Sequence, residues 1–230
     1  MTEAHPQLTI PLKVPTLNRL EDFDTGANAE LLTRIRELAA GAATPGLWLW
    51  GPAGSGRSHL LQGACQATQA RGGHARYLPL AGLPRNPELL EGTADLVAVD
   101  DVDTWLGERE LEIGLMGLYQ TQLDARRALL LSAGRGPAGL PFALADLESR
   151  CRALPSFAVA PPDDAGLRRI LTVKARERGL VLSDGVLDYW LHRGPRSLPA
   201  LLAQLTVLDD RALAEQRRIT VPFVKAELAL

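Results

Sequence analysis

Residues 47–61 read LWLWGPAGSGRSHLL, and this stretch decides the fold. Its apolar first part predicts a buried strand, the glycine-rich part predicts a turn, and the part after it predicts the start of a helix. Strand, turn and helix in this order carry the P-loop pattern G-x-x-x-x-G-[K/R]-[S/T]. In a P-loop, backbone N–H groups and the helix N-terminus converge on a polyphosphate, and the serine hydroxyl is offered to Mg²⁺. The residues expected to bind nucleotide here are Gly51, Gly54, Ser55, Gly56, Arg57 and Ser58.

Arg57 occupies the position that usually carries lysine in this pattern. An arginine is a planar, always-charged fork, whereas a lysine is a compact point charge. We therefore expect phosphate binding to persist and efficient turnover to be impaired. The alternative is a plain strand–turn–helix without a ligand. The helical spacing of Leu60, Leu61 and Ala64 after the turn favours the P-loop.

The composition limits the class of protein. The 230 residues are 46% hydrophobic, which suffices for one large or two modest domains. A formal net charge of −2 argues against a stand-alone nucleic-acid binder. The cysteines and histidines lack metal-site spacing, so we expect no metal beyond Mg²⁺ carried with the nucleotide. No signal-peptide pattern and no apolar run of about 18 residues occurs, which predicts a cytoplasmic protein without membrane contact.

The segment before the P-loop is rich in proline. Residues 7–12 read QLTIPL, and another proline follows at position 15. Prolines at this density keep a segment extended, which leaves Leu8, Ile10 and Leu12 exposed ahead of the folded part. Such a tail can dock as a peptide in a hydrophobic groove of a partner. The alternative, an arm packed on its own domain, stays open at this point.

A second apolar stretch, residues 96–99, ends in the paired carboxylates Asp100 and Asp101. Downstream of a P-loop this pattern is typical of a Walker B strand. The first acid would hold the magnesium shell together with Ser58, and the second would orient or deprotonate a water molecule. A strand that merely ends at a polar turn is the alternative, and the preceding P-loop disfavours it.

The rest of the chain alternates between expected strands and helices. Further strands are expected at 75–80, 129–132 and 157–159, which predicts a parallel sheet with helices on both faces. Pro161 and Pro162 then mark a boundary, and the apolar residues beyond them recur at helical spacing. We expect an extended tail at 1–18, an α/β nucleotide-binding domain at 19–162 and a small helical domain at 163–230.

With these pieces in order, the chain resembles the AAA+ ATPases, and among them the DnaA-related family of the replication initiator DnaA and its shortened relative Hda. The resemblance covers essentially the whole chain. It rests on the order and spacing of QLTIPL, LWLWGPAGSGRSHLL, LVAVDD, LLLSAGR, DLESR, PRSL and ITVPFVKAELAL. The arginine in the P-loop and the lack of a helix-turn-helix extension favour the Hda type. The resemblance implies a five-stranded sheet of order 5-1-4-3-2 followed by a helical lid.

The resemblance also implies roles for individual residues. Arg150 matches the arginine finger, which reaches across a subunit boundary to a neighbour's γ-phosphate. Arg196 matches the second sensor, which touches the chain's own nucleotide, and Ser132 lies at the first sensor. The residues that resemble the peptide engaging the sliding clamp, the β subunit of DNA polymerase III, are Gln7, Leu8, Ile10, Pro11 and Leu12.

One departure from the family bears on mechanism. Gly134 stands where the initiator tends to carry an acidic residue beside the first sensor. Together with Arg57, this indicates a site that holds ADP or ATP and hydrolyses little of it.

The implied function is a clamp-tethered regulator that stimulates hydrolysis of DnaA-bound ATP in trans and so limits re-initiation of replication. Its partners would be DnaA, the sliding clamp, DNA through the clamp and, in a homo-oligomer, further copies of the chain. One alternative is an autonomous P-loop ATPase that remodels proteins or loads a helicase. Another is a nucleotide-stabilised scaffold on the clamp.

Overall fold

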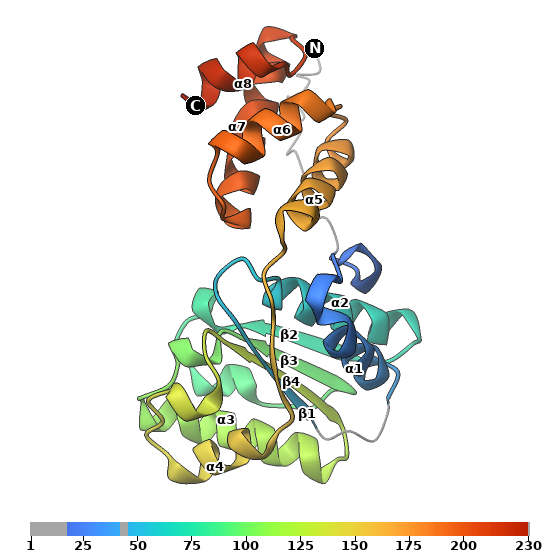
Figure 1. Ribbon diagram of the computed structural model, residues 1–230. Coiled ribbons are helices and arrows are strands. Elements are labelled where there is room, and N and C mark those ends of the chain that lie inside the picture. Colours follow the sequence, from blue (N-terminus) through green and yellow to red (C-terminus); the bar gives the residue numbers. More distant parts are fainter. Residues whose placement is uncertain (1–17, 42–45, 230) are drawn as a thin grey trace, which may run out of the picture.

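A computed structural model describes residues 18–41 and 46–229. Its five strands are β1 (Gly46–Trp50), β2 (Ala75–Pro79), β3 (Leu96–Asp100), β4 (Ala128–Ala133) and β5 (Ser156–Ala158). All neighbouring strands are parallel, and the sheet order is β2-β3-β4-β1-β5. This is the predicted order 5-1-4-3-2 counted from the other edge, so the expected fold is confirmed (Figure 1).

The register of the central strands brings their carboxyl ends to one edge of the sheet. Leu49 of β1 lies opposite Ser132 of β4, and Val99 of β3 lies opposite Leu131. The P-loop, the Asp100–Asp101 pair and Ser132 therefore emerge side by side. Ligands of open α/β sheets bind beyond this carboxyl edge.

Helices cover both faces of the sheet. The first face packs against α1 (Ala29–Ala39) and α2 (Arg57–Ala70), and the second packs against α3 (Arg109–Asp124) and α4 (Ala145–Ala153). Because side chains alternate along a strand, Leu47 and Leu49 enter the first core and Trp48 enters the second.

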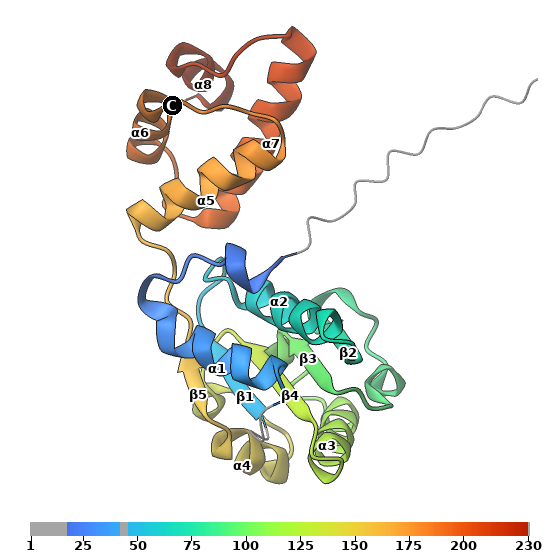
Figure 2. The ribbon, with the colours of Figure 1, turned by 90° about the vertical axis from the view of Figure 1, so that its right-hand side faces the viewer.

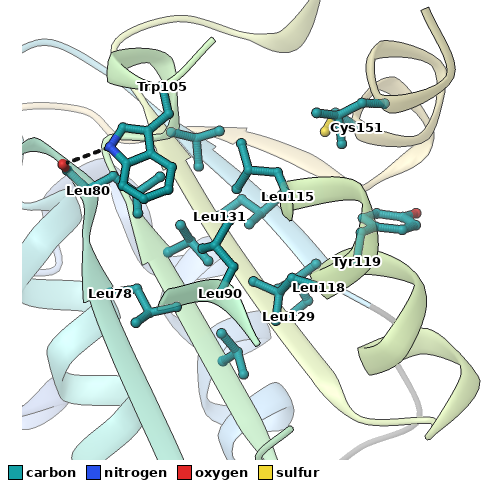
Figure 3. Packing of buried hydrophobic residues seen from close by; sticks show 14 of the residues in the cluster. Leu78, Leu80, Leu90, Trp105, Leu115, Leu118, Tyr119, Leu129, Leu131 and Cys151 are labelled. Atoms are coloured by element: carbon teal, nitrogen blue, oxygen red, sulfur yellow. Dashed lines mark hydrogen bonds between the residues drawn. The ribbon is translucent and has the colours of Figure 1, made fainter. Parts of the chain in front are cut away.

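The second core is held by apolar packing and by buried hydrogen bonds, among them that of Trp105. Leu129 and Leu131 of β4 pack with residues of α3, and the Trp105 indole N–H donates to the Leu80 carbonyl at 3.1 Å (Figure 3). Full burial of each such leucine contributes about 1.5–3 kcal/mol. The two cores keep the carboxyl ends of the strands in fixed register.

The C-terminal part is helical and has a core of its own. It contains α5 (Asp164–Glu177), α6 (Asp184–Arg193), α7 (Leu198–Glu215) and α8 (Val221–Leu228), packed around the buried Trp190. The Asp163 side chain caps α5 by accepting the Gly166 N–H at 2.7 Å. Helix α7 begins two residues after Arg196, and Pro199 lies in its first turn.

The helical part stands beyond the P-loop end of the sheet, joined by the segment 159–163 (Figures 1 and 2). No helix within residues 18–41 and 46–229 is long and apolar enough to cross a membrane. The expected clamp-binding residues 7–12 lie outside the described part of the chain.

Candidate nucleotide-binding site

The P-loop backbone requires its glycines. Gly54 and Gly56 have φ angles of 80° and 101°, in the left-handed region that favours glycine. A Cβ on Gly54 would lie 2.4 Å from Pro199 Cδ, and one on Gly56 would lie 2.6 Å from Phe23 Cε2. The loop therefore lies in close contact with α7 and with the segment before α1.

The loop carries two buried polar atoms without a hydrogen-bond partner, Ser55 Oγ and Arg57 Nη1. Leaving a buried polar group unsatisfied costs about 1–3 kcal/mol. A hydroxyl and a guanidinium N–H can both donate to an anion, and both lie at the start of α2, where the helix dipole favours negative charge. These residues fit a phosphate group.

Arg57 is also paired with the second Walker B acid. Its Nη2 donates to Asp101 Oδ1 at 3.0 Å, and the two side chains are 13% and 31% exposed. Burial and the adjacent Asp100 raise the pKa of the Asp101 carboxyl above its ordinary value, while Arg57 acts against this. The pairing keeps Asp101 on the P-loop cation, where it is poorly placed to act on water.

Asp100 lies buried between two hydroxyl donors. Ser132 donates to its Oδ1, and Tyr77 donates to its Oδ2 at 2.7 Å. The Ser132 oxygen also accepts the Asp101 N–H at 3.1 Å, so the predicted sensor and the two acids are brought together. Burial and the contact with Asp100 raise the pKa of Tyr77, which keeps its hydroxyl protonated as a donor.

A magnesium ion at Asp100 and Ser58 fits only as part of a nucleotide complex. Ser58 is exposed in the first turn of α2, whereas both Asp100 oxygens already accept hydrogen bonds. No group of three or more His, Cys, Asp or Glu residues in the described part of the chain is placed to hold a metal ion. The remaining ligands would be phosphate oxygens and water, as Mg²⁺ prefers.

A third carboxylate, that of Asp103, lies beside Gly134, the position at which the sequence lacks the acidic residue of the initiator. Asp103, in the 3-10 turn Val102–Thr104, accepts the Gly134 N–H at 3.0 Å. A Cβ on Gly134 would lie 3.1 Å from Asp103 Oδ2 and 3.9 Å from Arg57 Nη1. Asp103 thus places an acidic group beside Gly134 from the neighbouring loop, which the motif comparison did not foresee.

Beside the P-loop, a cavity of about 430 Å³ opens between the segment before α1, helix α2 and the helical part. Its volume is within the range of small-molecule sites, roughly 300–1,000 Å³. Ser55 and Gly56 connect it to the loop. Its mainly apolar walls include Phe23, His59, Ile170, Val173, Leu198 and Leu202. The arrangement offers an anion-binding end at the P-loop and an apolar compartment beside it, as a nucleoside phosphate requires.

Arg196 and Arg150 lie away from this cavity. Arg196 Nη1 binds both carboxylate oxygens of Asp164, at 2.6 and 2.8 Å, and its side chain is 71% exposed. It lines a separate hollow on the helical part. Arg150 is on α4, at the end of the sheet opposite the helical part (Figures 1 and 2). The structure therefore brings neither arginine to the chain's own P-loop.

Residues 164–228 match the family model described as Hda, lid domain. Domain III of the Thermotoga maritima replication initiation protein DnaA is 18% identical, with a TM-score of 0.81, over 92% of this chain and 95% of that one. AMPPCP-bound DnaA from Aquifex aeolicus is 20% identical, with a TM-score of 0.69, over 87% and 70%. The chain therefore shares its fold with these DnaA structures, and its residues 164–228 are similar to the lid domain of Hda.

The T. maritima RuvB Holliday junction branch migration motor has a similar fold, with 15% identity and a TM-score of 0.70 over 92% of this chain and 71% of that one. In the present chain, helices α5–α8 make up the part that matches the lid model, and they are called the lid below. The lid is tied to the segment before α1 by the Arg169–Asp24 ion pair, whose Nε–Oδ1 distance is 2.7 Å. The Asn28 amide binds the segment that leads to the lid, donating to the Ala160 carbonyl at 3.0 Å and accepting the Ala160 N–H at 2.8 Å.

Motif reading missed Tyr77, Asp103 and the cavity walls. Tyr77 lies on β2, whose sequence carries no motif, and it reaches Asp100 only because β2 pairs with β3. Phe23 and the lid residues meet across the cavity although they are distant in sequence. Of these residues, only Asp103 could have been recognised from the sequence, because it lies two residues after the Walker B pair.

His59 should make folding stability depend on pH. Its Nε2 lies 2.7 Å from the Arg19 carbonyl, and its ring centroid is 5.6 Å from that of Phe23. Burial, assisted by Lys174, lowers the pKa of His59 below 6.5, although the Arg19 contact opposes this. Because the unfolded chain then binds more protons, stability is lost as the pH falls through 6.5 toward the lower folded pKa.

We therefore expect the free energy of unfolding to fall between pH 7 and 5.5 more steeply in the wild type than in His59→Gln. Urea titrations at several pH values measure this. The matched control is His192→Gln in the lid. Equal pH slopes in the wild type and His59→Gln would contradict the assignment.

Proposed function

We propose that this protein is a nucleotide-bound, clamp-tethered regulator that stimulates hydrolysis of DnaA-bound ATP in trans and so limits re-initiation of replication. It acts in the cytoplasm, and it meets DNA through the clamp. The observation that carries the proposal is the position of Arg150 on α4, away from the chain's own P-loop. An arginine in that position lies away from the chain's own nucleotide site, and we propose that it serves the nucleotide of a neighbouring molecule.

Nucleotide binding is supported by the unpartnered Ser55 Oγ and Arg57 Nη1 and by the adjoining cavity. The loop N–H groups and Arg57 would hold the phosphates of ADP or ATP, and Asp100 and Ser58 would hold Mg²⁺, which neutralises phosphate charge. Arg196 would touch phosphate only after leaving Asp164. The relative whose structure contains AMPPCP has the same fold.

Weak hydrolysis of the protein's own nucleotide is supported by the pairing of Asp101 with Arg57. A group that activates water must be free to accept its proton. The Asp101 carboxylate instead accepts a hydrogen bond from the Arg57 guanidinium. The bound nucleotide would then stabilise the cleft between the core and the lid, without driving a cycle of its own.

The regulatory step in trans would be performed by Arg150. A guanidinium placed at the γ-phosphate stabilises the charge that develops there during hydrolysis. The same arrangement allows a homo-oligomer in which one copy presents α4 to the next. The deciding experiment is a DnaA ATP-hydrolysis assay with clamp-loaded DNA that compares the wild type with Arg150→Ala.

The tether would be the tail of residues 1–18, ahead of a nucleotide-binding domain at 19–162 and a lid domain at 163–230. We expect the double substitution Leu8→Ala and Leu12→Ala to weaken clamp binding by about 100-fold or more, because two leucines that enter the clamp groove would contribute roughly 1.5–3 kcal/mol each. Surface plasmon resonance on immobilised clamp measures this. Lys13→Ala is the control, and unchanged clamp affinity of the double variant would refute the tether.

The principal alternative is an autonomous ATPase. The meeting of Asp100, Asp101 and Ser132 at the strand ends favours it, because hydrolysing P-loop enzymes use such groups. Steady turnover by the isolated protein at about one per second or faster would support it. A clamp-bound scaffold is the remaining candidate, and it requires that Arg150→Ala leaves stimulation of DnaA intact.

A further inference from the structure

Helix α3 contacts the helix of the arginine finger at two points. Glu112 and Tyr119 lie seven positions apart on α3, and each makes a defined contact with the segment 143–150. Motif reading assigned no role to either residue. Both lie on the second face of the sheet, away from the P-loop cavity.

Glu112 fixes the start of α4. Its side chain is fully buried, and its carboxylate accepts the N–H groups of Gly107 and Ala143, each at 2.8 Å, and of Leu144 at 2.7 Å. Leu144 is the N-cap residue of α4. Charge-assisted hydrogen bonds of this length are stronger than neutral ones. The first turn of α4 is therefore held in one position relative to α3.

Tyr119 supports the other end of the finger helix. The Arg150 guanidinium carbon lies 5.8 Å from the centre of the Tyr119 ring, and the Tyr119 hydroxyl donates to the Arg150 carbonyl at 3.5 Å. The ring is itself buried in the second core, near Cys151 of α4 (Figure 3). An aromatic face attracts a cation at this distance. The contact favours one orientation of a side chain that is otherwise only partly covered.

We infer that Tyr119 is a positioning residue that holds the Arg150 guanidinium ready for a neighbouring molecule's nucleotide. This inference rests on the proposed function. A long arginine side chain loses rotamer freedom when it enters a binding site, and a side chain that is already ordered loses less. Tyr119 acts through Arg150, so its loss should lower the rate of the stimulated reaction and leave nucleotide binding at the P-loop unchanged.

The test compares Tyr119→Leu, Tyr119→Met and Tyr119→Phe in the DnaA ATP-hydrolysis assay with full-length protein, clamp and DNA. The aliphatic variants should lower the maximal stimulated rate about two- to fivefold, the size of a partly exposed cation–π contact. The protein concentration for half-maximal stimulation should stay the same. Tyr119→Phe keeps the ring and should retain the wild-type rate. Ile113→Ala, on the same helix but exposed, is the matched control.

Thermal unfolding and ADP binding of each variant separate positioning from general damage. Tyr119→Met fills the space with a flexible apolar side chain, so it serves where Tyr119→Leu does not fold. Wild-type rates in the folded aliphatic variants would overturn the inference, as would an equal loss in Tyr119→Phe. Arg150→Ala in the same assay separates the role of Tyr119 from the proposed function on which it rests. If Arg150→Ala loses stimulation and Tyr119→Leu does not, only the positioning role of Tyr119 is wrong. If Arg150→Ala keeps stimulation, the arginine finger and the positioning role are both wrong.

Discussion

Arg150→Ala is expected to reduce the stimulated rate of DnaA ATP hydrolysis by about 10³-fold or more, the lower end of the effect of an arginine finger. The guanidinium would neutralise charge that develops on the γ-phosphate, and alanine supplies no replacement. Nucleotide and clamp binding should be unchanged, because α4 lies at the end of the sheet opposite the lid and the P-loop. Release of phosphate from DnaA preloaded with ATP, in a single turnover, measures the effect.

Arg152→Ala provides a matched control for this prediction. Arg152 is on the same helix, and its guanidinium pairs with Glu148 at 2.9 Å on the protein surface. Such exposed pairs contribute about 0–1 kcal/mol, so this variant should fold and stimulate normally. If Arg150→Ala and Arg152→Ala stimulate alike, the finger is elsewhere and the scaffold becomes the better account.

The sequence was sufficient for the sheet because its strands are short apolar runs in a parallel α/β order. Parallel strands place their carboxyl ends along one edge, so the motifs at 51–58 and 100–101 had to meet there. The contact between Ser132 and Asp100 additionally requires β3 and β4 to be neighbours. That strand order was implied by the family resemblance and did not follow from the order of the elements alone.

The details that determine charge in the site depended on side-chain contacts between loops. The pairing of Arg57 with Asp101 and the approach of Asp103 to Gly134 follow from how the loops after β3 and β4 pack. The position of Arg196 likewise depends on a side-chain contact, because Arg196 pairs with Asp164 within the lid. A sequence motif gives the residue types at such positions, but it does not specify with which residue each charged side chain forms an ion pair.

Arg57→Ala is expected to weaken ADP binding about 100-fold, measured by isothermal titration calorimetry. Two effects act in the same direction. Phosphate loses a charge-assisted hydrogen-bond donor, a contribution of about 1.5–3 kcal/mol. In addition, Asp101 loses its cation while Asp100 and Asp103 remain nearby, so the vacated site becomes more negative where phosphate should bind. A loss of 2.7 kcal/mol corresponds to about 100-fold in affinity.

Two further variants separate these effects. Arg57→Lys keeps the charge and should retain ADP affinity within about tenfold, although a point charge cannot satisfy both phosphate and Asp101 as a fork does. Adding Asp101→Asn to Arg57→Ala should recover about tenfold of the lost affinity, because the amide removes an uncompensated carboxylate. If Arg57→Ala bound ADP as the wild type does, the buried guanidinium would serve only to hold Asp101. If the double variant recovered nothing, the acidic residues would not oppose phosphate, and the affinity would depend on the lost donor alone.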